Sequence, residues 1–133
     1  MPIPATFPAT AAIYCALSVL LVIGLAMRVV KLRRAHGVGI GDDGNVDLAR
    51  CIRVHANTLE NLPLALVLLV LLDMSGVASG WIHGIGATLL LARLAHAVGL
   101  SGRSGYSIGR FHGTLVTWLL MLVMAGWLLL RSV

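Results

Sequence analysis

The chain has 133 residues, of which 59% are hydrophobic and only 11% are charged, and its mean hydropathy is +0.95. This composition excludes an ordinary soluble globular domain and predicts an integral membrane protein. The length leaves room for about four spanning helices of roughly 20 residues each, without a separate soluble module. The net charge of +5 does not indicate a nucleic-acid partner, because the basic residues flank apolar segments and are not interleaved with aromatic residues.

The first apolar segment predicts a helix over about residues 9–33, which follows a proline-containing entry and is long enough to span a bilayer. The segment lacks the basic first region of a signal peptide, so we expect it to be retained. The helix is expected to end in a basic cluster formed by Arg28, Lys31, Arg33 and Arg34. A glycine-rich, acidic loop over residues 37–45 follows.

Three further helices are expected, over about residues 47–74, 78–100 and 107–130. Asp47 is a candidate N-cap for the second helix. Pro63 predicts a kink inside that helix, because proline removes one backbone hydrogen bond. The whole chain is therefore predicted to form one all-α domain, an integral membrane four-helix bundle.

Lysine and arginine are concentrated in the first and third connecting loops and the adjoining helix ends, whereas the second loop has none. Positively charged loops are retained on the cytoplasmic side of a membrane. We therefore expect the first and third loops in the cytoplasm and both termini outside. Arg131 is the one basic residue that argues against this orientation.

The second predicted helix carries a polar face at the mouth of the apolar run Leu64–Leu72. Arg53, Asn57 and Glu60 lie at i, i+4 and i+7, so they share one side of the helix. Ionisable groups are expensive inside a membrane and usually serve a site. Three more polar residues fall near helix ends on the same predicted side and can converge with this face on one cleft: Arg93, His96 and Arg110.

Such a cleft suits a small zwitterionic ligand, because arginine holds carboxylates through paired hydrogen bonds and glutamate accepts an ammonium group. In the alternative reading, Glu60 pairs with Arg93 or Arg53 inside the bundle and neutralises the charge without any ligand. Asn57 and His96 are then interhelical hydrogen-bonding residues. The residues alone leave both readings open.

A zinc site is a further alternative, with Cys51 and His55 at i, i+4 and His36 or His112 brought in by folding. We set it aside because no ligand-rich motif recurs in the sequence. Cys15 and Cys51 are expected to be free thiols, since two cysteines without a secreted, loop-rich context do not make a disulfide framework.

Small and aromatic residues of the last two helices are expected to serve packing. Tyr106 and Trp118 are interpreted as interfacial or packing aromatics rather than substrate platforms. Four glycines are expected to let neighbouring helices approach closely: Gly84, Gly86, Gly113 and Gly126.

The second helix resembles that of the membrane-associated proteins in eicosanoid and glutathione metabolism, the MAPEG family, which carries Arg-x-His-x-Asn-x-x-Glu followed by proline. Here the motif reads Arg53-Val54-His55-Ala56-Asn57-Thr58-Leu59-Glu60, followed by Pro63. The resemblance spans nearly the whole chain and is closest to the bacterial branch, whose connections are short. It extends to Val30-Lys31-Leu32-Arg33, to Arg93-Leu94-Ala95-His96 and to Arg110.

This resemblance implies a left-handed four-helix bundle, assembled as a homotrimer in the bacterial inner membrane, with glutathione between neighbouring subunits near the cytoplasmic face. It implies that Arg110 stabilises the thiolate, which is the attacking species and adds to a lipophilic electrophile dissolved in the bilayer. It also implies that Arg53 and Lys31 bind the carboxylates of the ligand, that Asn57 forms hydrogen bonds with it, and that Glu60 binds its ammonium group. Arg93 and His96 would support the cleft.

Several positions depart from the better-studied eukaryotic enzymes of the family. Lys31 stands where arginine is usual and lacks the planar guanidinium fork. Leu100 and Thr114 replace tyrosines, Ala56 replaces a second arginine of some members, and Phe111 stands where one branch has serine. These departures argue against eicosanoid synthesis and indicate weak glutathione binding. The alternative function is a non-catalytic structural or lipid-binding membrane protein, in which buried charge pairs only fix helix register and trimer contacts.

The charge distribution predicts the location of the C-terminus. A compartment-sensitive reporter fused there is expected to show an extracytoplasmic position, because the basic first and third loops are held in the cytoplasm. The measurement is reporter activity in intact cells. A cytoplasmic reporter would overturn the predicted orientation.

Overall fold

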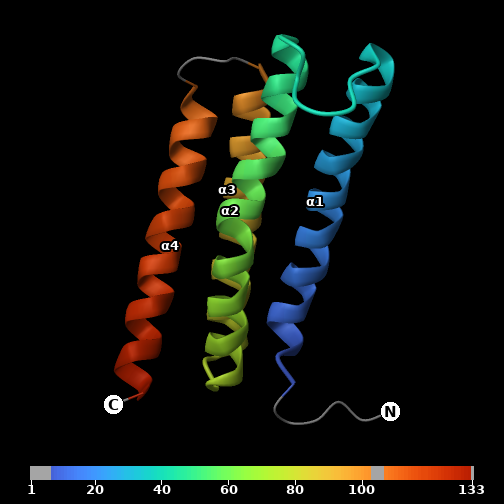
Figure 1. Ribbon diagram of the computed structural model, residues 1–133. Helices are drawn as coiled ribbons and strands as arrows, with labels where there is room; N and C mark the ends of the chain where they lie inside the picture. Colours follow the sequence, from blue (N-terminus) through green and yellow to red (C-terminus); the bar gives the residue numbers. More distant parts are fainter. Residues whose placement is uncertain (1–6, 103–106, 133) are drawn as a thin grey trace.

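The computed structural model describes residues 7–102 and 107–132, apart from the side chains of residues 100–102. Four helices, all long and apolar enough to be candidate membrane spans, and no strand occur in these ranges. The predicted all-helical architecture with four candidate spans is therefore confirmed. The helices, shown in Figure 1, are α1 (Ala9–His36), α2 (Val46–Met74), α3 (Ser79–Gly102) and α4 (Ile108–Ser132).

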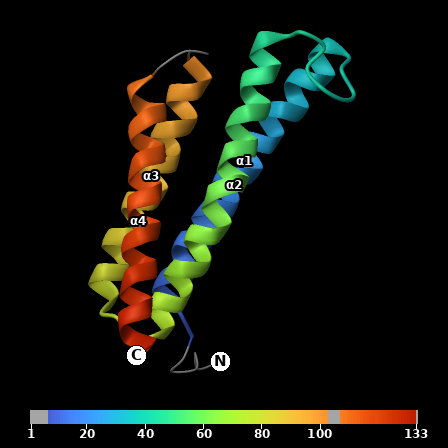
Figure 2. The ribbon, with the colours of Figure 1, turned by 60° about the vertical axis from the view of Figure 1, so that its left-hand side comes forward.

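The helices form two neighbouring pairs (Figures 1 and 2). α1 packs along α2 and α3 packs along α4, while α2 also contacts α3 and α4, and α1 also contacts α3. Within the described ranges α1 does not contact α4, and the two lie on opposite sides of the bundle in Figure 1. We call the end where the α1–α2 connection lies the loop end, and the end where α1 begins and α4 stops the terminal end.

α1 extends beyond its predicted end near residue 33 and stops at His36. Gly37 adopts a left-handed conformation with φ of 67°, which glycine does without strain. There the N–H groups of Gly37 and Val38 bond to carbonyl groups of the last turn, Gly37 N to Arg34 O and Val38 N to Arg33 O. Basic side chains in a last turn complement the helix dipole, so the basic cluster prolongs the helix rather than ending it.

The N-terminus of α2 is capped by Asn45 and not by Asp47. The Asn45 side-chain oxygen accepts hydrogen bonds from the backbone N–H groups of Asp47 and Leu48, both at 3.0 Å. The prediction of Asp47 as N-cap is therefore wrong; Asp47 lies in the first turn, where a carboxylate favours the positive end of the helix dipole. α2 then continues as one helix through Pro63 to Met74.

The apolar core fills the terminal half of the bundle. Its buried members come mainly from the second half of α2 and the first half of α3, with single contributions from α1, α4 and the α2–α3 connection. The central residues of this core are Leu62, Leu69, Leu72, Ile82, Leu89 and Met124. Toward the loop end a much smaller buried pair, Val54 and Ala97, takes its place, which leaves that end to polar side chains.

Two hydrogen bonds close the terminal end around the turn between α2 and α3. The Asp73 carboxylate accepts from the N–H of Ala11 at 2.8 Å, and the Arg131 guanidinium donates to the carbonyl of Ser75 at 2.6 Å. Both ends of the described chain are thus attached to this turn. The side chain of Arg131 therefore has a local structural partner, independent of membrane orientation.

Two of the four glycines expected at helix contacts do lie at them. A Cβ on Gly86 would collide with the ring of Tyr14, and one on Gly113 would lie 2.5 Å from the carbonyl oxygen of Ala92. A Cβ on Gly84 or Gly126 would meet no atom within 4 Å in the described structure, so these two glycines do not mediate helix contacts within the chain.

Three expectations fall outside the described residues. They concern residues 1–6 of the proline-containing entry that was expected over residues 1–8, the basic residue Arg103 and the aromatic residue Tyr106. The side chain of Leu100, which stands where a tyrosine of the family commonly contacts the ligand, likewise lies outside the described part of the chain.

The contact at Gly113 predicts that alanine is not tolerated there. Gly113→Ala is expected to lower the free energy of unfolding by about 1 to 3 kcal/mol, because the added methyl group overpacks the α3–α4 contact. Gly126→Ala, in the same helix but in open space, is expected to be neutral or to stabilise by up to about 1 kcal/mol through helix propensity. Detergent-solubilised protein unfolded with SDS and followed by circular dichroism measures both. Equal effects of the two variants would contradict the packing assignment.

Candidate functional site

Two adjoining hollows lie at the loop end, between the first half of α2, the second half of α3 and the start of α4. The first has a volume of about 400 Å³ and the second about 550 Å³. Three residues line both hollows, one from each of the three helices: Asn57, His96 and Arg110. We call the two hollows together the cleft.

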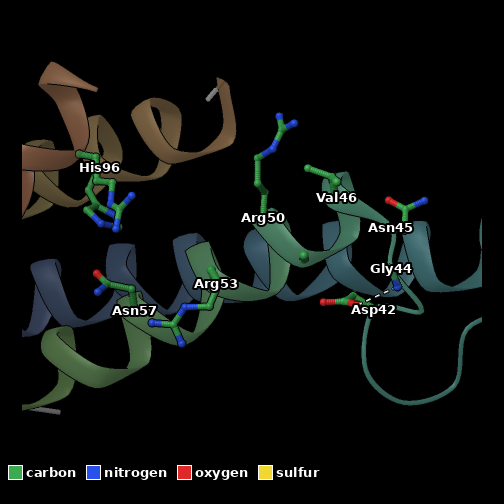
Figure 3. Close-up of a pocket in the computed structure, with 10 residues that line it drawn as sticks. Asp42, Gly44, Asn45, Val46, Arg50, Arg53, Asn57 and His96 are labelled. Atoms are coloured by element: carbon green, nitrogen blue, oxygen red, sulfur yellow. Dashed lines mark hydrogen bonds between the residues drawn. The ribbon is translucent and has the colours of Figure 1, made fainter. Parts of the chain in front are cut away.

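The first hollow, which we call the polar hollow, is lined by cationic side chains. Arg50 and Arg53 come from α2, and Arg110 comes from α4. Figure 3 shows Arg53 and Asn57 along α2, with His96 on the neighbouring helix above them. The acidic residue in the lining, Asp42, lies at the loop side, where its carboxylate accepts a hydrogen bond from the N–H of Gly44 at 3.0 Å. The hollow therefore favours an anionic ligand.

The second hollow, which we call the aromatic hollow, opens along α4. Phe111, Leu115 and Trp118 form its apolar side, and all three are exposed in the single chain. The Trp118 indole N–H donates to the side-chain oxygen of Asn61 on α2 at 2.8 Å. The i, i+4, i+7 spacing of these three apolar residues in the sequence places them on one helix face. The same spacing is typical of a packing or lipid-facing stripe, so the sequence pattern alone does not indicate a hollow.

Arg93 lies behind the cleft and is fully buried, with 0% of its surface exposed. One terminal nitrogen, Nη2, donates to the side-chain oxygen of Asn57 at 2.8 Å. The same nitrogen lies 3.4 Å from Nδ1 of His96 and 3.5 Å from Oγ1 of Thr58. Its Nε and Nη1 have no hydrogen-bond partner among the described residues. Arg93 thus joins α3 to α2 immediately behind the wall shared by the two hollows.

Glu60 lies outside the cleft and pairs with Arg53, with 3.6 Å between Oε1 and Nη1. The two side chains are 52% and 61% exposed in the single chain. One of the two pairings considered from the sequence, Arg53 with Glu60, is therefore present. It lies on the surface of α2 and not inside the bundle.

Lys31 also lies outside the cleft of one chain. It lines two separate hollows on α1, one of them shared with Asp47 and Cys51 of α2. Cys51 and Arg53 are two positions apart on a helix and point in nearly opposite directions. The α2 face that meets α1 is therefore opposite the face that lines the cleft.

The structure thus brings together Arg53, Asn57, His96 and Arg110, with Arg93 directly behind them. It adds Arg50, which also pairs with Asp47 at 3.4 Å. In the described part of the chain, no group of three or more histidine, cysteine, aspartate or glutamate side chains gathers as a metal site would require. Cys15 and Cys51 are both free, and Cys51 is buried.

The bond between Trp118 and Asn61 predicts a measurable link between α4 and α2. Trp118→Phe is expected to lower the free energy of unfolding by about 1 kcal/mol, because it removes the indole N–H and with it the hydrogen bond to the side-chain oxygen of Asn61. Trp81→Phe is the control, since Trp81 is similarly exposed and makes a ring contact with Trp127 instead. SDS unfolding followed by circular dichroism measures the difference. A cost no greater than that of the control would show that the bond contributes nothing.

Comparison with known proteins places the chain in a family. The sequence model of the MAPEG family matches residues 11–130. Two relatives named Inner membrane protein YecN, from Escherichia coli strain K12 and from strain CFT073, are each 36% identical over 113 residues, which is 85% of this chain and 85% of each relative. Together with the four candidate membrane spans, these matches show that the chain is an integral membrane protein that belongs to the MAPEG family.

Proposed function

We propose that this chain binds glutathione, or a closely similar thiol peptide, and adds its sulfur to lipophilic electrophiles taken from the bilayer. The observation that carries the proposal is the cleft itself. A cationic hollow and an aromatic hollow meet at a wall formed by Asn57, His96 and Arg110. A charged, water-soluble reactant and an apolar one can therefore be held next to each other.

The polar hollow suits the peptide. Glutathione carries two carboxylates, and guanidinium groups such as those of Arg50 and Arg53 bind carboxylates through paired, charge-assisted hydrogen bonds. Asn57 supplies a neutral hydrogen-bonding group beside them. The volume of about 400 Å³ falls in the range of small-molecule sites.

Arg110 is the proposed catalytic residue, because it lines both hollows. A fixed guanidinium favours the thiolate over the thiol, and the thiolate is the nucleophile. With an aryl halide, the sulfur forms a bond to the ring carbon, the carbon–halogen bond breaks and halide leaves with its electron pair. The thiol proton passes to water.

The aromatic hollow is the proposed site of the electrophile. Phe111, Leu115 and Trp118 present apolar surface on the exposed side of α4, which faces lipid or a neighbouring copy in a membrane. A lipophilic molecule can reach this surface from the bilayer without crossing water.

Glu60 and Lys31 would contribute to a binding site only when several copies of the chain assemble. Both side chains are exposed and lie outside the cleft of their own chain. In a homotrimer whose sites lie between subunits, Glu60 would bind the ligand ammonium group and Lys31 a carboxylate next to a neighbouring copy. We further propose that the first and third connections face the cytoplasm, where glutathione is available.

A non-catalytic role is the second candidate, and two observations favour it. The Arg53–Glu60 pair and the Arg93–Asn57 hydrogen bond each satisfy polar groups without a ligand. In that case the polar residues only set how the helices associate.

Calorimetric titration of the detergent-purified protein with glutathione separates the two candidates. Arg53→Ala is expected to weaken binding by roughly tenfold or more, because a charge-assisted hydrogen bond is lost. Arg110→Ala is expected to lower turnover of a generic aryl halide by roughly 100-fold while glutathione affinity changes much less. Arg34→Ala is the control, since it removes the same charge at the same end of the bundle but away from the cleft.

Two outcomes would contradict the proposal. Intact oligomers of Glu60→Gln and Arg110→Ala with unchanged affinity and turnover would exclude the enzyme. Loss of the oligomer in both variants, with no glutathione binding by the unmodified protein, would favour the structural role.

A further inference from the structure

The guanidinium group of Arg93 contacts the side chains of two cleft residues, Asn57 and His96. A guanidinium group has five N–H donors and no acceptor. Any polar atom that meets Arg93 at hydrogen-bonding distance must therefore accept. Both Asn57 and His96 meet it through one of their two polar atoms.

For Asn57, this contact determines the orientation of the amide. The side-chain oxygen lies 2.8 Å from Nη2 of Arg93, and the reverse orientation would place the amide NH₂ against a second donor. The oxygen is therefore directed at Arg93. The NH₂ group is what Asn57 has left for the cleft that it lines.

For His96, the contact determines the position of the ring proton. Nδ1 lies 3.4 Å from Nη2 of Arg93, so Nδ1 is the acceptor and the proton of the neutral ring is on Nε2. A doubly protonated ring would place a donor and a positive charge against the buried guanidinium. Nε2–H is therefore the ring group that His96 has left for the two hollows that this residue lines, and it is a donor.

We propose that Arg93 is a positioning residue, which makes hydrogen-bond donors of Asn57 and His96 and so limits the ligand group between the two hollows to an acceptor, such as a carboxylate, a carbonyl or a thiolate. Arg53 and Arg110, which line the same cleft, are also donors only. The statement about ligand choice rests on the proposed function, whereas the statement about Asn57 and His96 does not.

The tautomer of His96 tests the arrangement without any ligand. We would record a two-bond ¹H–¹⁵N correlation spectrum of the full chain with ¹⁵N-labelled histidines, and assign His96 by the signal lost in His96→Gln. The Nε2–H tautomer is expected. In Arg93→Met the donor is gone, and the signal is expected to shift toward a mixture of tautomers, whereas Arg34→Met should leave it in place.

Asn57→Asp tests the donor toward the ligand. A carboxylate keeps an acceptor for Arg93, so helix content and unfolding should be retained, but it has no NH₂ group for the cleft. Glutathione affinity is expected to fall by more than tenfold relative to Asn45→Asp. That control adds the same charge at the far side of the polar hollow, where aspartate can replace asparagine as N-cap.

The experiments separate a failure of the positioning role of Arg93 from a failure of glutathione binding. A His96 ring with its proton on Nδ1 in the unmodified protein would overturn the inference, whatever glutathione does and whether or not Arg93→Met folds. So would Asn57→Asp with glutathione affinity equal to that of the control. If the unmodified protein binds no glutathione, the proposed function fails, and the His96 spectrum still decides whether Arg93 positions its neighbours.

Discussion

A buried guanidinium is the constraint around which the loop end is built. Arg93 has no exposed surface, and a buried charge is tolerated only where hydrogen-bond acceptors surround it. Asn57 and Thr58 of α2 and His96 from the next turn of α3 provide them for one terminal nitrogen, Nη2, while Nε and Nη1 have no partner among the described residues. This contact joins two helices at the loop end, where the buried apolar cluster consists of Val54 and Ala97 alone among the described residues. The terminal half is held by apolar packing instead.

Residues on different faces of α2 lie in three different environments, and one of these faces lines the cleft. Cys51, Val54 and Thr58 are buried against neighbouring helices. Arg53 and Asn57 line the cleft on another face, and Glu60 stays on the surface beside Arg53. Charged groups are concentrated before Pro63, and the remainder of the helix is almost entirely apolar up to Asp73. Such a distribution places the cations of α2 toward the loop end of the bundle and leaves the rest of the helix apolar, as a membrane span requires.

The close approach of α3 and α4 brings the remaining cleft residues into position. Gly113 lies against Ala92 and His96 with no space for a side chain, so the start of α4 is held next to the end of α3. Arg110 and His96 consequently line the same two hollows. The aromatic side chains Phe111 and Trp118 of α4 remain exposed in the single chain. In the proposed function, polar and apolar reactants would therefore approach the shared wall from separate sides.

The sequence by itself determined the membrane class, the four helices and the polar motif of α2, because length, hydropathy and helical spacing are properties of single segments. The C-terminal end of α1 is set by Gly37 and the start of α2 by Asn45, and both caps are local features of the sequence. The prediction of Asp47 as the cap of α2 was wrong. Only the tertiary structure decided that Lys31 faces away from the cleft, that Arg93 is buried against Asn57, and that Trp118 lines a hollow. These placements depend on how each helix is rotated about its axis, and a helix that is apolar on most sides does not encode that rotation in its own sequence pattern.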